Sequence, residues 1–219
     1  MDSIKEFVWD IIGYLIPGLY LFILLYICLD NSFIDNLNIV SNFQIWTVIV
    51  VSYILGYAIY GLGALKERIR RDKSYIKIIE LRVRNRMAFN IVSKDIISKF
   101  SNTKTDFNFD DATVRDFRSI AMGLFPESEK KIYTFTFRSD ISNHAGNTSF
   151  LFGLIGLINV ILKCIFSFYL FKTNTLFIIL YVCLIISYFL FRETRNKFYA
   201  ISINLPFSIY SSNLLKNEN

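Results

Sequence analysis

The chain contains a single histidine, His144, and an arginine, Arg138, lies six positions before it in the stretch RSDISNH. An imidazole transfers protons near neutral pH and a guanidinium holds the charge of a phosphate, so the pair has the residue types needed for phosphodiester cleavage. The alternative is that the two residues have no catalytic role and are polar residues at the membrane interface, just before a span. The sequence has no Ser-His-Asp set, metal-ligand cluster, P-loop or dinucleotide fingerprint, and we expect neither metal nor cofactor.

A second group of polar residues interrupts an apolar stretch. Asn159 and Lys163 lie in LINVILKCIFSF, residues 157–168. On a helix they share one face with small residues, because the spacings are three or four throughout. Small residues let helices approach closely, and polar ones bond across the contact. We therefore predict a helix-packing face, through which copies of the chain associate or which lines a pore, with a weaker one of the same kind on an earlier span. The predicted residues are Ser52, Gly56, Gly153, Gly156, Asn159, Lys163 and Ser167.

Lys163 has two interpretations. In the first, it lies about 12 Å from the outer end of its span and extends its stem outward to water. In the second, it faces the bundle interior or a wet cavity, since charges inside a membrane are costly and are usually buried or paired. Asp30, at the outer end of the first span, is the expected partner in the second interpretation.

The elements that carry these residues are membrane spans. Hydrophobic residues make up 53% of the 219 positions, and the chain has 22 Phe and 13 Tyr, too many for one small water-soluble core. They are gathered into four blocks, at residues 11–29, 45–65, 148–171 and 176–191. The first three have about the 20 residues that crossing a bilayer requires, and the fourth is short but extendable.

The charges orient these spans. A basic cluster follows the second block and consists of Lys66, Arg68, Arg70, Arg71 and Lys73. Further basic residues follow the fourth block, whereas the linker after the first block is acidic. The positive-inside rule then predicts that both termini are cytoplasmic. The basic cluster also suits anionic lipid, and less well nucleic acid, since no aromatic residues interleave with it.

The predicted architecture is an all-α membrane protein with four transmembrane helices. A hairpin at residues 1–65 precedes a basic cytoplasmic insert at 66–147, which contains 17 of the 24 Lys and Arg residues; a second hairpin at 148–191 and a cytoplasmic tail at 192–219 follow. The insert is mainly helical by periodicity, with Asp110 and Asp111 as candidate N-caps. Alternation in IIELRVR and KIYTFTF leaves a small strand pair open.

Two resemblances extend this interpretation. Arg138 and His144 resemble the R-x4-6-H motif of HEPN ribonucleases, which implies that Arg138 holds phosphate and His144 handles protons. The whole chain resembles small four-pass bacterial membrane proteins with PG in the first span, SYILGY in the second, a charged insert and FRSDISNHAGNTSF before the third. Such proteins accompany antiviral systems, as membrane accessories of RNA-targeting CRISPR loci or membrane components of Kiwa-type systems.

These resemblances imply two functional hypotheses. The first is an oligomeric inner-membrane protein of prokaryotic antiviral defence that perturbs the membrane or serves as an accessory. Its partners are the lipid bilayer, further copies of the chain and a cytoplasmic protein that acts through the insert. The alternative is a membrane-tethered HEPN-like ribonuclease that uses Arg138 and His144.

Overall fold

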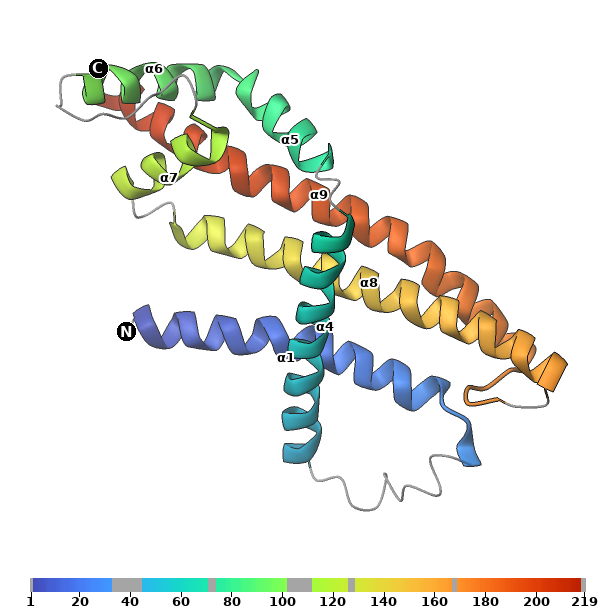
Figure 1. The fold of residues 1–219 in the computed structure, drawn as a ribbon. Coiled ribbons are helices and arrows are strands. Elements are labelled where there is room, and N and C mark those ends of the chain that lie inside the picture. The colour runs from blue at the N-terminus through green and yellow to red at the C-terminus, as the bar shows by residue number, and fades with distance from the viewer. Residues whose placement is uncertain are drawn as a thin grey trace. The chain divides into compact units, whose positions relative to one another are not determined.

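The computed structural model describes residues 2–32, 45–70, 74–101, 112–125, 129–166 and 169–217. These residues form seven helices: α1 (Asp2–Cys28), α4 (Ile45–Arg70), α5 (Ser74–Arg84), α6 (Met87–Ser101), α7 (Val114–Leu124), α8 (Glu129–Phe166) and α9 (Thr175–Asn217). Figure 1 shows these helices. The described residues contain no strand, and their one isolated β-bridge joins Leu29 to Phe171. Both IIELRVR and KIYTFTF are helical, so the strand alternative is wrong.

Four of these helices are long and apolar enough to cross a membrane: α1, α4, α8 and α9. The expectation of a multi-pass, all-helical membrane protein is therefore confirmed at this level. Two of the helices extend beyond the predicted spans, since α8 starts at Glu129 and α9 continues to Asn217. At 1.5 Å per residue their 38 and 43 residues measure about 57 Å and about 65 Å, against about 30 Å of hydrocarbon.

The chain divides into two compact units, and α8 and α9 contribute to both. The span unit comprises Met1–Arg71 and Asp140–Arg195, and the insert unit comprises Asp72–Ser139 and Asn196–Asn219. The core of the span unit contains Leu24, Cys28, Phe152, Phe171, Tyr181 and Leu184. Within it α8 and α9 pack side by side, as the ring contact of Phe150 with Tyr188 at 5.1 Å shows.

The insert unit has its own apolar core. Its buried residues come from four helices and from a position two residues before α7: Ile79, Val83, Phe89, Val92, Ile96, Ala112, Val114, Phe117, Ala121, Ile203, Phe207 and Tyr210. Phe89 makes edge contacts with Phe117 at 5.6 Å and with Phe207 at 5.1 Å. The C-terminal part of α9 thus completes this core, and residues of the predicted tail share it with the insert.

Helix α7 begins with a capping box. The hydroxyl of Thr113 accepts from the backbone N–H of Asp116, and the Asp116 carboxylate accepts from the backbone N–H of Thr113. This reciprocal pair satisfies two backbone donors that a helix start leaves free. The N-cap is therefore Thr113, and the prediction of Asp110 or Asp111, which lie outside the described residues, is wrong.

Candidate functional site

Helix α4 crosses α1 (Figure 1), and Ser52 and Gly56 lie at this crossing. A methyl group on Gly56 would overlap the carbonyl oxygen of Tyr14, and one on Gly18 would overlap the carbonyl oxygen of Ser52. The two backbones therefore touch, as small residues at a helix contact permit. Ser52 and Gly56 are both buried, and this part of the predicted packing face meets the chain's own first helix.

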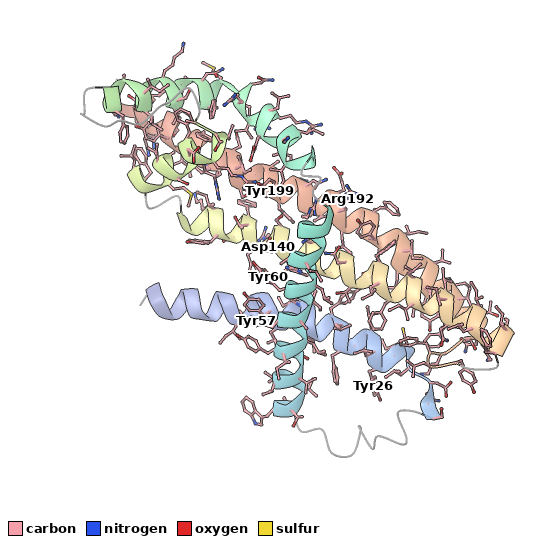
Figure 2. All side chains as sticks on the ribbon, in the orientation of Figure 1. Tyr26, Tyr57, Tyr60, Asp140, Arg192 and Tyr199 are labelled. Atoms are coloured by element: carbon pink, nitrogen blue, oxygen red, sulfur yellow. The ribbon has the colours of Figure 1, made fainter. Side chains whose placement is uncertain are left out.

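The tyrosines around this crossing form an aromatic cluster. The ring of Tyr14 stacks on Tyr57 with centroids 4.3 Å apart and makes edge contacts with Tyr53 and Tyr60. Figure 2 labels Tyr57 and Tyr60 on α4. Offset and edge-on arrangements of this kind are the favourable geometries for aromatic rings. The cluster therefore reinforces the contact that the glycines allow.

The small residues of α8 contact α9. A Cβ atom on Gly153 would lie 2.7 Å from both Ile185 Cγ1 and the carbonyl oxygen of Tyr181, and one on Gly156 would overlap the Tyr181 ring. A larger residue at either position would force its neighbour on α9 to shift, because that neighbour already occupies the space. The face that was predicted to join subunits is thus covered, at Gly153 and Gly156, by the same chain.

The side chain of Asn159 forms hydrogen bonds with the backbone of the connection between α8 and α9. Its side chain is only 5% exposed. The amide oxygen accepts from the backbone N–H groups of Leu170, at 2.7 Å, and Phe171, at 3.4 Å, and the amide nitrogen donates to the Phe171 carbonyl at 3.0 Å. A polar side chain inside an apolar helix is thereby explained, since it satisfies backbone groups that the connection leaves unpaired.

Lys163 reaches outward along the same connection. Its ammonium donates to the Thr173 hydroxyl at 2.6 Å and lies 4.5 Å from the centroid of the Tyr169 ring. The side chain is exposed, and in the described residues it forms no ion pair with Asp30, whose carboxylate accepts from Ser32. This geometry favours the outward interpretation. Ser167, the last residue of the predicted face, lies outside the described residues.

His144 is buried in the span unit. It is 6% exposed, its ring lies 5.2 Å from that of Tyr60, and a Cβ atom on Gly63 would lie 3.2 Å from its Cε1. Its Nδ1 has no hydrogen-bond partner in the described part of the chain. The hydroxyl of Thr148, one turn further along α8, and that of Ser52 are also buried and unpaired there. Among its described residues, the span unit therefore holds three buried polar atoms with unused hydrogen-bonding capacity.

Arg138 has different neighbours. Its guanidinium lies over the rings of Phe135 and Phe198, 5.9 Å and 5.8 Å from their centroids. It lies six positions before His144 on one helix, which amounts to about 9 Å of rise and about 120° of rotation. The two side chains therefore leave α8 on different sides of the helix, and the ribonuclease hypothesis stays a prediction.

The basic cluster is only partly described. Helix α4 continues to Arg70, but the side chains of Lys66, Arg68 and Arg70, and the whole of Arg71 and Lys73, lie outside the described residues. The assignment of this cluster to lipid or nucleic acid stays a prediction.

Sequence reasoning missed a polar group in the insert unit. Arg115 Nε donates to Glu80 Oε1 at 2.8 Å, and Arg115 Nη2 donates to the Tyr199 hydroxyl at 3.1 Å. Arg118, one turn further along α7, has a buried Nε without a hydrogen-bond partner in the described residues. The signal in the sequence was the spacing of the two arginines in VRDFR, which places both on one helix face.

The side chains that the structure describes include no group of three His, Cys, Asp or Glu residues that could hold a metal ion. No protein-family model, no curated protein and no solved structure matches this chain. The resemblance to membrane proteins of antiviral systems therefore stays a prediction.

Proposed function

We propose that the chain is an inner-membrane protein of a prokaryotic antiviral defence system, with both termini in the cytoplasm. Its insert unit receives a cytoplasmic protein partner or signal, and its span unit perturbs the membrane or tunes another membrane component. The observation that carries the proposal is the continuity of α8 and α9, each of which runs without a break from an apolar span into the insert unit.

A continuous helix can couple a signal in the insert unit to an effect in the span unit. Its backbone hydrogen bonds resist bending, so a displacement of one end also displaces the other. The span unit contains groups that such a displacement would expose to water. In a bilayer, buried polar atoms need a partner in the protein or a water-filled cavity, and Ser52, His144 and Thr148 have no such partner in the described residues. Displacement of α8 would hydrate these atoms and raise permeability.

Self-association is part of the proposal. Since Ser52 and Gly56 on α4 and Gly153 and Gly156 on α8 are covered within the chain, further copies would meet the outer faces of these helices. Exposed residues there include Ile54 and Leu62 on α4 and Leu154 and Ile158 on α8. Gly61, on the exposed side of α4, has open space around it and permits close approach of another helix.

The test breaks α9 beside the boundary between the units. Lys197 is exposed on α9, two residues beyond Arg195. Lys197→Pro removes one backbone hydrogen bond and kinks the helix, whereas Lys197→Ala removes the same charge and keeps the helix. In phage-infected cells carrying the chain, a voltage-sensitive dye should report depolarisation with wild type and Lys197→Ala but not with Lys197→Pro, at equal amounts in the membrane fraction and with total RNA intact.

Two results would count against the proposal. Equal depolarisation by the proline and alanine variants would rule out coupling through α9. If wild type neither depolarises infected cells nor changes phage yield, the defence role itself would be wrong. RNA decay ahead of any depolarisation would instead favour the ribonuclease hypothesis, with His144→Ala as its next test.

A further inference from the structure

Arg118 is a half-buried cation whose guanidinium forms no ion pair within the described residues. The described ion pairs join Lys99 to Asp95 and Arg115 to Glu80. Arg118 lies one helical turn after Arg115, on the same side of α7, yet it shares neither carboxylate. Within the described residues, the carboxylate of Glu80 pairs with Arg115 and leaves Arg118 without an ion-pair partner.

The burial of this guanidinium is unfavourable as it stands. Its Nε is enclosed and donates to no acceptor in the described part of the chain. Burial lowers the pKa of Arg118 below its ordinary value, and the nearby charge of Arg115 acts in the same direction. A buried charge without a counter-ion is destabilising, and a group of opposite charge with hydrogen-bond acceptors relieves that cost.

The surroundings of Arg118 supply further groups that suit an anion. The phenols of Tyr199 on α9 and Tyr133 on α8 lie within electrostatic range of its guanidinium. Arg115 is held in place by Glu80 and by the Tyr199 hydroxyl, so its remaining N–H groups are oriented. Figure 2 labels Tyr199 on α9. All five residues belong to the insert unit.

We propose that Arg118, together with Arg115 and the hydroxyl of Tyr199, binds a phosphoryl group. The planar fork of a guanidinium donates two parallel hydrogen bonds to phosphate oxygens, and a bound phosphate would supply the missing negative charge. The phosphoryl group is carried either by a soluble phosphate compound or by a lipid headgroup. This site stands apart from the proposed function, because it is measured on purified protein and needs neither phage nor membrane potential.

The first experiment measures thermal unfolding of the purified full-length chain in detergent, with inorganic phosphate titrated against chloride at constant ionic strength. We expect a saturable rise in Tm with phosphate. Arg118→Met should weaken the apparent affinity by about tenfold or more, as the loss of a charged hydrogen-bond pair implies. Arg82→Met, on the exposed side of α5, removes an equal charge and should leave the phosphate effect unchanged.

The Tm of Arg118→Met without phosphate shows whether this variant folds stably. Without phosphate its Tm should equal or exceed that of wild type, because an apolar side chain of similar length replaces an unpaired buried charge. A much lower Tm together with no phosphate effect in wild type would mean that a carboxylate of the chain itself pairs with Arg118, and the proposal would fall. An equal phosphate effect in wild type and Arg118→Met would also overturn it.

The second experiment separates the two sources of the phosphoryl group. The chain is placed in nanodiscs of phosphatidylcholine alone or with added phosphatidylglycerol. If the anionic lipid raises Tm in wild type but not in Arg118→Met, and removes the effect of free phosphate, the site binds a lipid headgroup. If free phosphate protects equally in both nanodiscs and only through Arg118, the ligand is soluble. No phosphate or lipid response in either nanodisc would contradict the site.

Discussion

Asn159 and Lys163 lie one turn apart on α8, but their side chains have opposite environments. Asn159 is buried and satisfies three backbone groups of residues 170 and 171, whereas Lys163 is exposed and makes one bond to a hydroxyl. We predict that Asn159→Ala lowers the free energy of unfolding by about 1–3 kcal/mol, because it leaves buried backbone groups unpaired. Lys163→Gln should change it by less than about 0.5 kcal/mol.

The measurement is thermal unfolding in detergent, combined with limited trypsin digestion of the connection. Asn159→Ala should speed cleavage after Lys172, since release of the connection gives the protease access to it. Lys163→Gln is the matched control on the same face of the helix. If Lys163→Gln proved the more damaging of the two, the ammonium would have a buried role that the outward geometry does not give it.

Asp95 makes the stability of the insert unit depend on pH. Its carboxylate accepts from Lys99 at 2.8 Å and from the Tyr210 hydroxyl at 2.6 Å. Burial alone would raise its pKa, but these hydrogen bonds outweigh burial and hold the pKa of Asp95 below the ordinary value of 3.8. A lowered folded pKa gives stability that is present above the unfolded pKa and lost as the pH falls through the folded one.

We therefore expect the Tm of the insert unit to fall between about pH 5 and about pH 3. Asp95→Asn cannot ionise, so it should have a lower Tm at neutral pH and a smaller acid response than wild type. Circular dichroism in the aromatic region, recorded over a pH series, measures both. An acid response that is identical in wild type and Asp95→Asn would assign the effect to other carboxylates, such as Asp116 in the cap of α7.

At the scale of helices, α4 contains two glycines in different environments: Gly56 is packed against α1, and Gly61 has open space around it. A methyl group on Gly56 would meet the backbone of Tyr14, whereas one on Gly61 meets nothing within 4 Å. We predict that Gly56→Ala destabilises the span unit by about 1–3 kcal/mol through overpacking. Gly61→Ala should be neutral or stabilising by up to about 1 kcal/mol, because alanine has the higher helix propensity.

Unfolding in mixed detergent micelles, titrated with a denaturing detergent, compares the two glycine variants directly. Equal midpoints for Gly56→Ala and Gly61→Ala would mean that α1 and α4 do not touch at this crossing. A loss of self-association in Gly61→Ala, with the fold intact, would place another copy of the chain on the outer face of α4.

The small-residue faces illustrate what the sequence could predict about these helices. Spacings of three and four identified Gly153, Gly156 and Asn159 as residues that meet protein, and all three are buried. The pattern could not name the neighbour, because periodicity fixes a side of a helix and not what lies against it. The partner of Gly156 is Tyr181 in the same chain, which only the tertiary structure reveals.

Helix ends were harder to predict than helix centres. The apolar block of the fourth span stops at Phe191 because charged residues follow, and the prediction stopped there too. Charge ends a hydrophobic block but does not end a helix, and α9 continues through these residues to Asn217. In KIYTFTF the alternation of apolar residues matched a strand, yet the segment lies inside α8, since tertiary packing overrides a short local pattern.

At the scale of the molecule, the residues that follow α1 lie beside the connection between α8 and α9, at one end of the span unit. The end of α1 pairs with the connection between α8 and α9: the Asp30 N–H donates to the Leu170 carbonyl at 3.0 Å, and the Lys172 N–H donates to the Cys28 carbonyl at 2.8 Å. We therefore predict that the ends of the first and third spans lie on the same side of the bilayer. The basic residues at the other ends of the spans predict that this side is external.

This shared end gives the last prediction, which uses single cysteines in a variant whose native residues Cys28, Cys164 and Cys183 are alanine. In spheroplasts, a membrane-impermeant maleimide should label Ser32→Cys and Thr175→Cys, because both positions are exposed beside the paired connections. Asn90→Cys, exposed on α6 of the insert unit, should react only after permeabilisation. The fully reversed pattern would keep the fold and invert its orientation. Labelling of Ser32→Cys and Thr175→Cys from opposite sides would contradict the pairing of Cys28 and Asp30 with residues 170–172, since hydrogen-bonded segments cannot lie on two sides of a membrane.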